Sequence, residues 1–228
     1  MNINKIKDLK CVLFDMDGTV LDSEKLFEEA QIELLKELNV DINVNDLNSF
    51  KGLSHRHFYP KFLKRFNVVE SIDNIRKRLR QILYKKMETN LEFIIGFEAF
   101  FKKYLLNNHI KVGIVTNTTR LSYEKIKKCI NIADYFEYSI TVDEAIEPKP
   151  SPKPYIQAMD HFSVKDYQTI IIEDSKTGLT SALKSNANVI GLTTTLTHSE
   201  IKSIDKNIII KGSYTEIGSV FKNIKITH

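Results

Sequence analysis

The sequence predicts an α/β fold, a parallel sheet flanked by helices, with a helical module inserted after the first strand. Three observations carry this prediction. The apolar run at residues 11–14 indicates a buried strand, residues 23–90 show only helical periodicity, and strands alternate with helices from about residue 97 onward. Such alternation implies right-handed crossovers and a parallel sheet. The chain has 228 residues, enough for one sizeable core and a smaller module.

The inserted module is predicted from four helical segments without a strand. The first has one apolar face, formed by Leu26, Phe27, Ala30, Leu34, Leu35 and Leu38. The last has an apolar stripe opposite Arg and Lys residues, formed by Ile72, Ile75, Leu79, Ile82 and Leu83. Shorter segments at 45–50 and 55–66 lie between them, joined by a turn at Gly52. We therefore expect a core domain over residues 1–21 and 94–228 and a helical domain over residues 22–93.

The rest of the core is predicted from short apolar runs separated by helical patterns. The strands after the first are expected at 112–116, 138–142, 169–173, 189–192 and 208–210, and the helices at 97–107, 121–129, 154–161 and 178–186. The carboxyl ends of parallel strands meet at one edge of a sheet, where open α/β folds bind their ligands.

Polar residues stand at the first strand end, in the string Asp15-x-Asp17-Gly18-Thr19. Gly18 lets the backbone turn sharply, and Thr19 places a hydroxyl beside the turn. Two carboxylates in this position can divide their roles. One serves as nucleophile or metal ligand, and the other as general acid and base.

Three further groups follow the later strands. Thr116 and Asn117 end the run at 112–115 and can donate hydrogen bonds to phosphate, although capping of the next helix is an alternative role. Lys149 stands among three prolines that fix the position of its ammonium group. Glu173 and Asp174 close the run at 170–172 and suit an oxygen-ligated cation. The alternative is helix capping by Asp174 or Ser175, which can coexist with metal binding.

These four groups, in this order, resemble the haloacid dehalogenase (HAD) superfamily of phosphohydrolases. The string through Asp22-Ser23-Glu24 resembles its β-phosphoglucomutase-like and sugar-phosphatase subgroup. The resemblance covers nearly the whole chain and implies a Rossmann-like core with a four-helix cap as the inserted module. It also implies an enzyme, namely a Mg²⁺-dependent phosphatase that hydrolyses a small phosphomonoester, such as a sugar phosphate, through an aspartyl-phosphate.

The resemblance assigns a role to each group. Asp15 is the nucleophile, Asp17 the general acid and base, and Thr116 and Lys149 neutralise the phosphoryl charge. The metal set is Asp15 and Asp174 through side chains, Asp17 through its backbone carbonyl, and Glu173 through water. The residues expected to bind substrate are Gly18, Thr19, Glu24, Gly52, His55, Arg56 and Asn117.

Other activities in the superfamily fit less well. A dehalogenase needs no second aspartate, and no motif marks a Schiff-base lysine for phosphonate hydrolysis. A β-phosphoglucomutase is the main alternative, because Lys51-Gly52-Leu53-Ser54 resembles its cap loop. However, Phe27 stands in place of its cap histidine and Thr119 in place of its second lysine, with Arg120 able to compensate in part. A silent regulator that binds a phosphorylated ligand is the third reading, and it is disfavoured because the whole motif set is present.

Bulk properties suit an anionic substrate, and the resemblance implies a small phosphorylated metabolite as the partner. The net charge of +4 is slight and not gathered into a basic stripe, so nucleic acid is not expected as a partner. No segment suggests a signal peptide or a membrane span. The two cysteines lack metal or disulfide spacing. We therefore expect a cytoplasmic protein without membrane partners, and a monomer by analogy with capped relatives.

Overall fold

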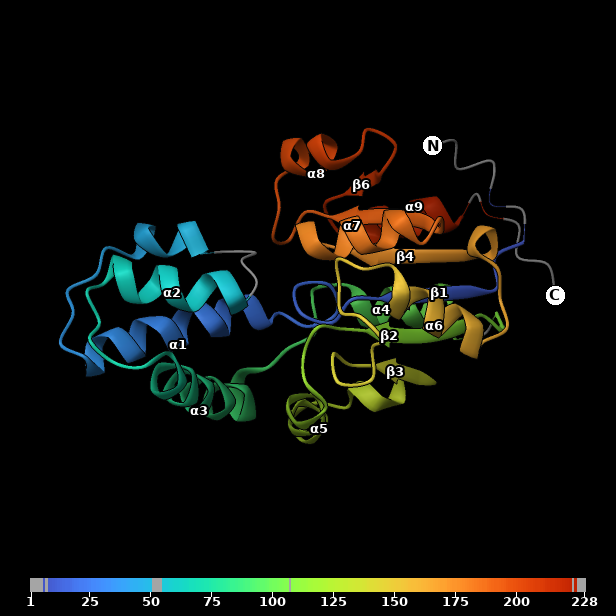
Figure 1. The fold of residues 1–228 in the computed structure, drawn as a ribbon. Coiled ribbons are helices and arrows are strands. Elements are labelled where there is room, and N and C mark those ends of the chain that lie inside the picture. Colours follow the sequence, from blue (N-terminus) through green and yellow to red (C-terminus); the bar gives the residue numbers. More distant parts are fainter. Residues whose placement is uncertain (1–5, 7, 51–54, 107, 223, 225–228) are drawn as a thin grey trace. The chain divides into compact units, whose positions relative to one another are not determined.

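The structure is a computed structural model that describes residues 6, 8–50, 55–106, 108–222 and 224. The chain divides into two compact units (Figure 1). Unit 1, the core unit, consists of Met1–Leu21 and Phe93–His228, and unit 2, the helical unit, consists of Asp22–Glu92.

The core unit is built on a six-stranded sheet with the order β3-β2-β1-β4-β5-β6. Its strands are β1 (Cys11–Phe14), β2 (Lys111–Val115), β3 (Tyr138–Ile140), β4 (Thr169–Glu173), β5 (Asn188–Leu192) and β6 (Ile209–Lys211). All neighbouring strands pair in parallel, which confirms the predicted parallel sheet. Strand β1 lies between β2 and β4, and the chain order reverses on either side of it. This is the position at which open α/β sheets bind ligands.

Helices cover both faces of this sheet. They are α4 (Phe97–Tyr104), α5 (Arg120–Cys129), α6 (Lys153–His161), α7 (Lys176–Lys184), α8 (His198–Ile204) and α9 (Tyr214–Phe221). Consecutive strand residues point to opposite faces. Leu13 accordingly belongs to a cluster with Tyr155 of α6 and Leu179 of α7. The ring of Phe14 lies edge-on to that of Phe97 in α4, with 5.8 Å between centroids.

Helices α8 and α9 were not among the elements expected from the sequence, although a helix start signal precedes each of them. Thr197 accepts a hydrogen bond from the backbone N–H of Glu200, whose side chain accepts one in return. The Ser213 side chain caps α9 by accepting from the backbone N–H of Glu216, whose own side chain accepts from the Gly212 N–H. Both starts match the Ser/Thr-x-x-Glu pattern of a capping box, which the sequence contains but the apolar periodicity of such short helices does not reveal.

The helical unit contains α1 (Ser23–Glu37), a 3₁₀ helix η2 (Val44–Phe50), α2 (His55–Arg65) and α3 (Ile72–Asn90). The predicted fold class, a parallel α/β core with an inserted helical module of four segments, is confirmed, and one of the four segments is a 3₁₀ helix. The centre of the helical unit is aromatic. The ring of Phe50 contacts those of Phe58, Phe62 and Phe66, and the ring of Phe62 also contacts those of Phe58 and Phe66. Within the described ranges, no helix combines the length and apolar character required to cross a membrane.

Candidate active site

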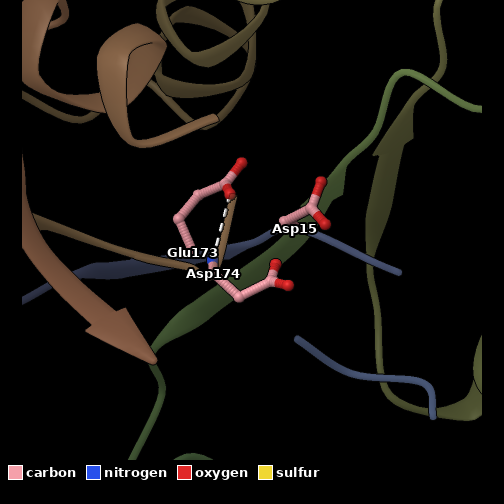
Figure 2. A group of neighbouring side chains, drawn as sticks. All are labelled: Asp15, Glu173 and Asp174. Atoms are coloured by element: carbon pink, nitrogen blue, oxygen red, sulfur yellow. Dashed lines mark hydrogen bonds between the residues drawn. The ribbon is translucent and has the colours of Figure 1, made fainter. Parts of the chain in front are cut away.

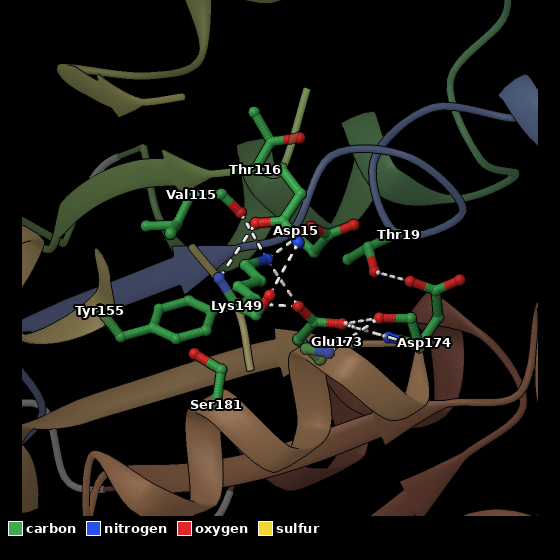
Figure 3. A network of polar contacts seen from close by, with 12 residues as sticks. Asp15, Thr19, Val115, Thr116, Lys149, Tyr155, Glu173, Asp174 and Ser181 are labelled. Atoms are coloured by element: carbon green, nitrogen blue, oxygen red, sulfur yellow. Dashed lines mark hydrogen bonds and ion pairs between the residues drawn. The ribbon is translucent and has the colours of Figure 1, made fainter. Parts of the chain in front are cut away.

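The candidate site lies at the carboxyl ends of three neighbouring strands. Asp15 follows β1, Thr116 follows β2, and Glu173 and Asp174 lie at the end of β4 (Figure 3). Strand pairing continues into these residues, since the Asp15 N–H donates to the carbonyl of Ile172 (3.0 Å) and the Thr116 N–H to that of Ile140 (2.9 Å). The backbone of the sheet therefore fixes where these polar side chains begin.

Lys149 lies at the centre of the polar network (Figure 3). Its ammonium donates to Asp15 Oδ1 (2.6 Å), to Glu173 Oε1 (2.6 Å) and to the carbonyl of Val115 (2.7 Å). All three ammonium protons are thus engaged. The side chain is only 2% exposed, so the loop that the sequence marked by its prolines carries a buried cation into the site.

Glu173 is fully buried and holds this lysine. Its Oε1 accepts from Lys149 and from the hydroxyl of Tyr155 (2.8 Å). Its Oε2 accepts from the backbone N–H groups of Asp174 and Ser175 and from the Ser175 hydroxyl. Tyr155 was not among the predicted site residues. Its position on α6 six residues after Lys149 was visible in the sequence, but nothing marked its hydroxyl as directed at Glu173.

The network carries surplus negative charge. Burial raises the pKa of Asp15 well above its usual value; Lys149 opposes this, while Glu173, Asp174 and Asp17 reinforce it. Burial alone would lower the pKa of Lys149, but Asp15 and Glu173 hold that pKa above its usual value. Lys149 is therefore charged, while Asp15 has too little positive charge around it to offset its burial.

Gly18 and Thr19 connect the loop after β1 to Asp174, which follows β4. Gly18 has a φ of +79°, and a Cβ at this position would overlap the Asp174 carboxylate. Thr19 is buried, and its hydroxyl donates to Asp174 Oδ1 (2.8 Å). Glycine is required here by both the backbone conformation and the close approach.

Asp17 lies close to a residue that the sequence analysis did not select. The hydroxyl of Thr118 donates to Asp17 Oδ2 (2.9 Å), while the Thr118 N–H donates to the Thr116 hydroxyl (3.0 Å). The loop after β2 therefore orients Asp17, the predicted acid and base, which lies in the loop after β1. The only sequence signal was the run of hydroxyl residues that continues after Thr116.

The Asn117 side chain forms two hydrogen bonds with the backbone of Lys149. Its amide oxygen accepts from the Lys149 N–H (3.1 Å) and its amide nitrogen donates to the Lys149 carbonyl (3.2 Å). This arrangement makes Asn117 a residue that positions the lysine loop, and its contact with substrate stays a prediction.

The capping alternatives are resolved by the helix starts. Thr119 caps α5, and Ser175 caps α7. Thr116 and Asp174 are buried and make the contacts described above instead. Neither side chain is therefore committed to a helix start.

The carboxylates fit a hard divalent cation. Ligand oxygens of Asp15, Glu173 and Asp174 all lie within 4.8 Å of one another (Figure 2). Mg²⁺ prefers such oxygen donors, and the surplus negative charge favours a cation. Because Glu173 already accepts from Lys149, Tyr155, Ser175 and two backbone N–H groups, direct ligation falls most easily to Asp15 and Asp174.

The remaining predicted residues belong to the helical unit. Glu24 lies in the first turn of α1. Gly52 and the side chains of His55 and Arg56 lie outside the described part of the chain. Their roles stay predictions.

Comparison with known proteins identifies the family of this chain. The haloacid dehalogenase-like hydrolase family matches residues 12–192. A phosphorylated carbohydrates phosphatase of Thermotoga maritima is 23% identical over 175 residues, which are 76% of this chain and 80% of that protein. The pyrophosphatase PpaX of Oceanobacillus iheyensis is 23% identical over 221 residues, 93% of this chain and 99% of that protein.

The fold agrees as well. A crystal structure from Thermotoga maritima, described as a candidate β-phosphoglucomutase, has a TM-score of 0.80 and 21% identity, and the match covers 95% of this chain and 100% of the other. The predicted superfamily and hydrolase class are therefore confirmed, and the chain belongs to the haloacid dehalogenase-like hydrolases.

Proposed function

We propose that this chain is a Mg²⁺-dependent phosphatase that hydrolyses a small phosphomonoester through an aspartyl-phosphate. The observation that carries the proposal is the buried Asp15 carboxylate at the end of β1, bonded at 2.6 Å to Lys149 and adjacent to the Asp174 carboxylate. The proposed nucleophile Asp15, the Lys149 ammonium and the Asp174 carboxylate thus lie together at the carboxyl edge of the sheet. A sugar phosphate is the favoured substrate class, in line with the name of the Thermotoga maritima relative.

In the first half-reaction, an oxygen of Asp15 attacks phosphorus and the ester bond to the leaving alcohol breaks. Lys149, which donates to Asp15, and the Thr116 hydroxyl, at the end of the adjacent strand β2, would offset and orient the charge on the phosphoryl oxygens. A bound Mg²⁺ would supply positive charge beside Asp15 and the phosphoryl group. That charge would oppose the effect of burial, which raises the pKa of Asp15.

Asp17 manages the proton in both half-reactions. It protonates the departing alkoxide and then, as a carboxylate, takes a proton from the water that hydrolyses the aspartyl-phosphate. The hydrogen bond from Thr118 to Oδ2 orients the Asp17 carboxylate for these transfers. We expect the helical unit to act as the cap that closes over the substrate.

The contacts of Arg120 count against the mutase alternative. Arg120 donates to both carboxylate oxygens of Glu144 (2.8 and 2.7 Å) and to the hydroxyl of Ser139 (3.1 Å). Thr119 caps α5. A mutase must retain a second phosphate between its two steps, and a guanidinium already bound bidentately is poorly suited to do so.

Phosphate release from a panel of phosphomonoesters, with and without Mg²⁺, tests the proposal. The panel includes β-glucose 1-phosphate, with glucose 6-phosphate formation followed separately, and pyrophosphate, because of the pyrophosphatase relative. Asp15→Asn should abolish release, whereas Asp160→Asn, the same change at an exposed aspartate, should not.

The outcomes separate the candidate functions. Mg²⁺-dependent release that is lost only in Asp15→Asn supports the phosphatase. Isomerisation without release would establish the mutase. Binding of a phosphorylated ligand without any turnover would establish the silent regulator.

A further inference from the structure

Both oxygens of the Asp174 carboxylate are held by hydroxyl groups. Thr19 donates to Oδ1 (2.8 Å), and Thr195 donates to Oδ2. Asp174 is 1% exposed, so water has little access to replace either donor. Thr19 belongs to the first motif, but Thr195 lies in the loop after β5, outside every motif that the sequence analysis used.

The loop after β5 also contacts Gly18, in the loop after β1. The hydroxyl of Thr194 donates to the carbonyl of Gly18 (2.5 Å). Two adjacent threonines thus reach two separate parts of the site, one the backbone of the loop after β1 and the other the carboxylate after β4. Strand β5 pairs with β4, which brings this loop to the same edge of the sheet.

This arrangement suits a metal ligand in particular. A carboxylate oxygen has two lone-pair sites, so an oxygen that accepts from a hydroxyl can still bind a cation. A hydroxyl carries no net charge and therefore orients the carboxylate without neutralising it. Side chains that fix ligand orientation in this way commonly control metal affinity.

We propose that Thr195 is a positioning residue for the metal site, which sets the Asp174 carboxylate in the orientation that binds a divalent cation. The proposal rests on the proposed function, since it takes Mg²⁺ as the cation bound there. It extends that function to a residue in the loop after β5, whose hydroxyl donates to the proposed metal ligand Asp174.

Titration calorimetry with MgCl₂, without any substrate, tests the proposal directly. Thr195→Val keeps the side-chain shape and removes the donor, and we expect the Kd for Mg²⁺ to rise about 10-fold or more. Thr195→Ser retains a hydroxyl and should restore most of the affinity. Thr193→Val is the matched control, because it makes the same change in the same loop and should leave the Kd unchanged. The midpoint of thermal unfolding in EDTA verifies that each variant is folded.

The outcomes distinguish this proposal from the proposed function. If the wild type binds Mg²⁺ and Thr195→Val is folded and binds it equally well, the role assigned to Thr195 is wrong while the metal-dependent phosphatase stands. A lower melting temperature with an unchanged Kd would likewise reduce Thr195 to a structural role. If the wild type binds no Mg²⁺, both the metal requirement and the role of Thr195 are wrong.

Discussion

Replacement of Lys149 by methionine tests whether the buried ion network is organised as described. Methionine nearly matches the length of the lysine side chain but lacks the charge and the three donors. Its introduction leaves the carboxylates of Asp15 and Glu173 facing each other without a cation, and it removes the donor to the Val115 carbonyl. We expect a large loss of stability, because these acceptors lie where water has little access.

The magnitude follows from the contacts. Two hydrogen bonds to charged groups are lost, each worth about 1.5–3 kcal/mol. Breaking a buried ion pair by removal of one partner typically costs about 3–5 kcal/mol. The two estimates overlap, so the free energy of unfolding should fall by about 3–5 kcal/mol.

Urea unfolding measures this loss, followed by both tyrosine fluorescence and far-ultraviolet circular dichroism, since the chain has nine tyrosines and no tryptophan. Coincident transitions are needed before a free energy is derived, because the chain forms two compact units. A loss below about 1 kcal/mol, the range of exposed ion pairs, would refute the reasoning.

Glu173→Gln provides the internal control through a double-mutant cycle. The amide oxygen of glutamine can accept from the N–H groups of Asp174 and Ser175, which places its NH₂ at the former Oε1 position. Beside the Lys149 ammonium this NH₂ meets another donor, whereas in the Lys149→Met background it can donate to Asp15 and to the Tyr155 oxygen. The double variant should therefore be more stable than the two single losses predict, by about 1–3 kcal/mol, while remaining inactive. Strictly additive losses would contradict this geometry.

Three further predictions concern residues around this network. Thr118→Val should lower kcat/KM about 10-fold for alkyl phosphates, because Asp17 loses its orienting donor. The loss should be smaller for 4-nitrophenyl phosphate, because its leaving group needs no proton. Equal losses for the two substrates would contradict the role of Thr118. Gly18→Ala should reduce the free energy of unfolding by about 1–3 kcal/mol, since the backbone has φ +79°. It should also weaken Mg²⁺ binding, because the added methyl group meets the Asp174 carboxylate. A variant with the urea midpoint and the Mg²⁺ affinity of the wild type would contradict this prediction. The hydrogen bond from Arg120 lowers the pKa of Glu144 from 4.5 to about 2. A carboxyl with a lowered folded-state pKa contributes stability that is present above its unfolded-state value and is lost as pH falls through the folded value. The difference in free energy of unfolding between wild type and Glu144→Gln should therefore have its full value near pH 7 and shrink as the pH falls from 4.5 toward 2. A difference that does not change with pH would show that it does not come from the ionised Glu144 carboxylate.

The sheet could be predicted from the sequence because its signals are local. Each strand is a short apolar run, and the observed strand ends differ from the expected ones by one or two residues, within the usual uncertainty of strand limits. Asp15, Thr116 and Asp174 could be placed together for the same reason, since each directly follows such a run and parallel strands end at one edge. Their identification needed no knowledge of distant contacts.

The residues that orient these groups could not be predicted in the same way. Thr118 reaches a partner 101 residues away, and Tyr214 donates to the Thr19 carbonyl from 195 residues away. Such contacts arise from how the helices and loops pack on the finished sheet. Single threonines and tyrosines carry no periodicity or spacing that would distinguish them from ordinary surface or core residues.

The chemistry of these orienting groups explains how a site can be both rigid and negatively charged. Carboxylates of the site accept hydrogen bonds from neutral hydroxyls, which come from Thr19, Thr118, Tyr155 and Thr195. Arginine or lysine at those positions would hold the carboxylates equally well but would cancel the charge that attracts a divalent cation. Lys149 is the one fixed cation that we find in the described network, and it is bonded to Asp15 and Glu173 rather than to Asp174. Neutral donors at Asp174 thus keep its charge for a metal, while the lysine serves the nucleophile.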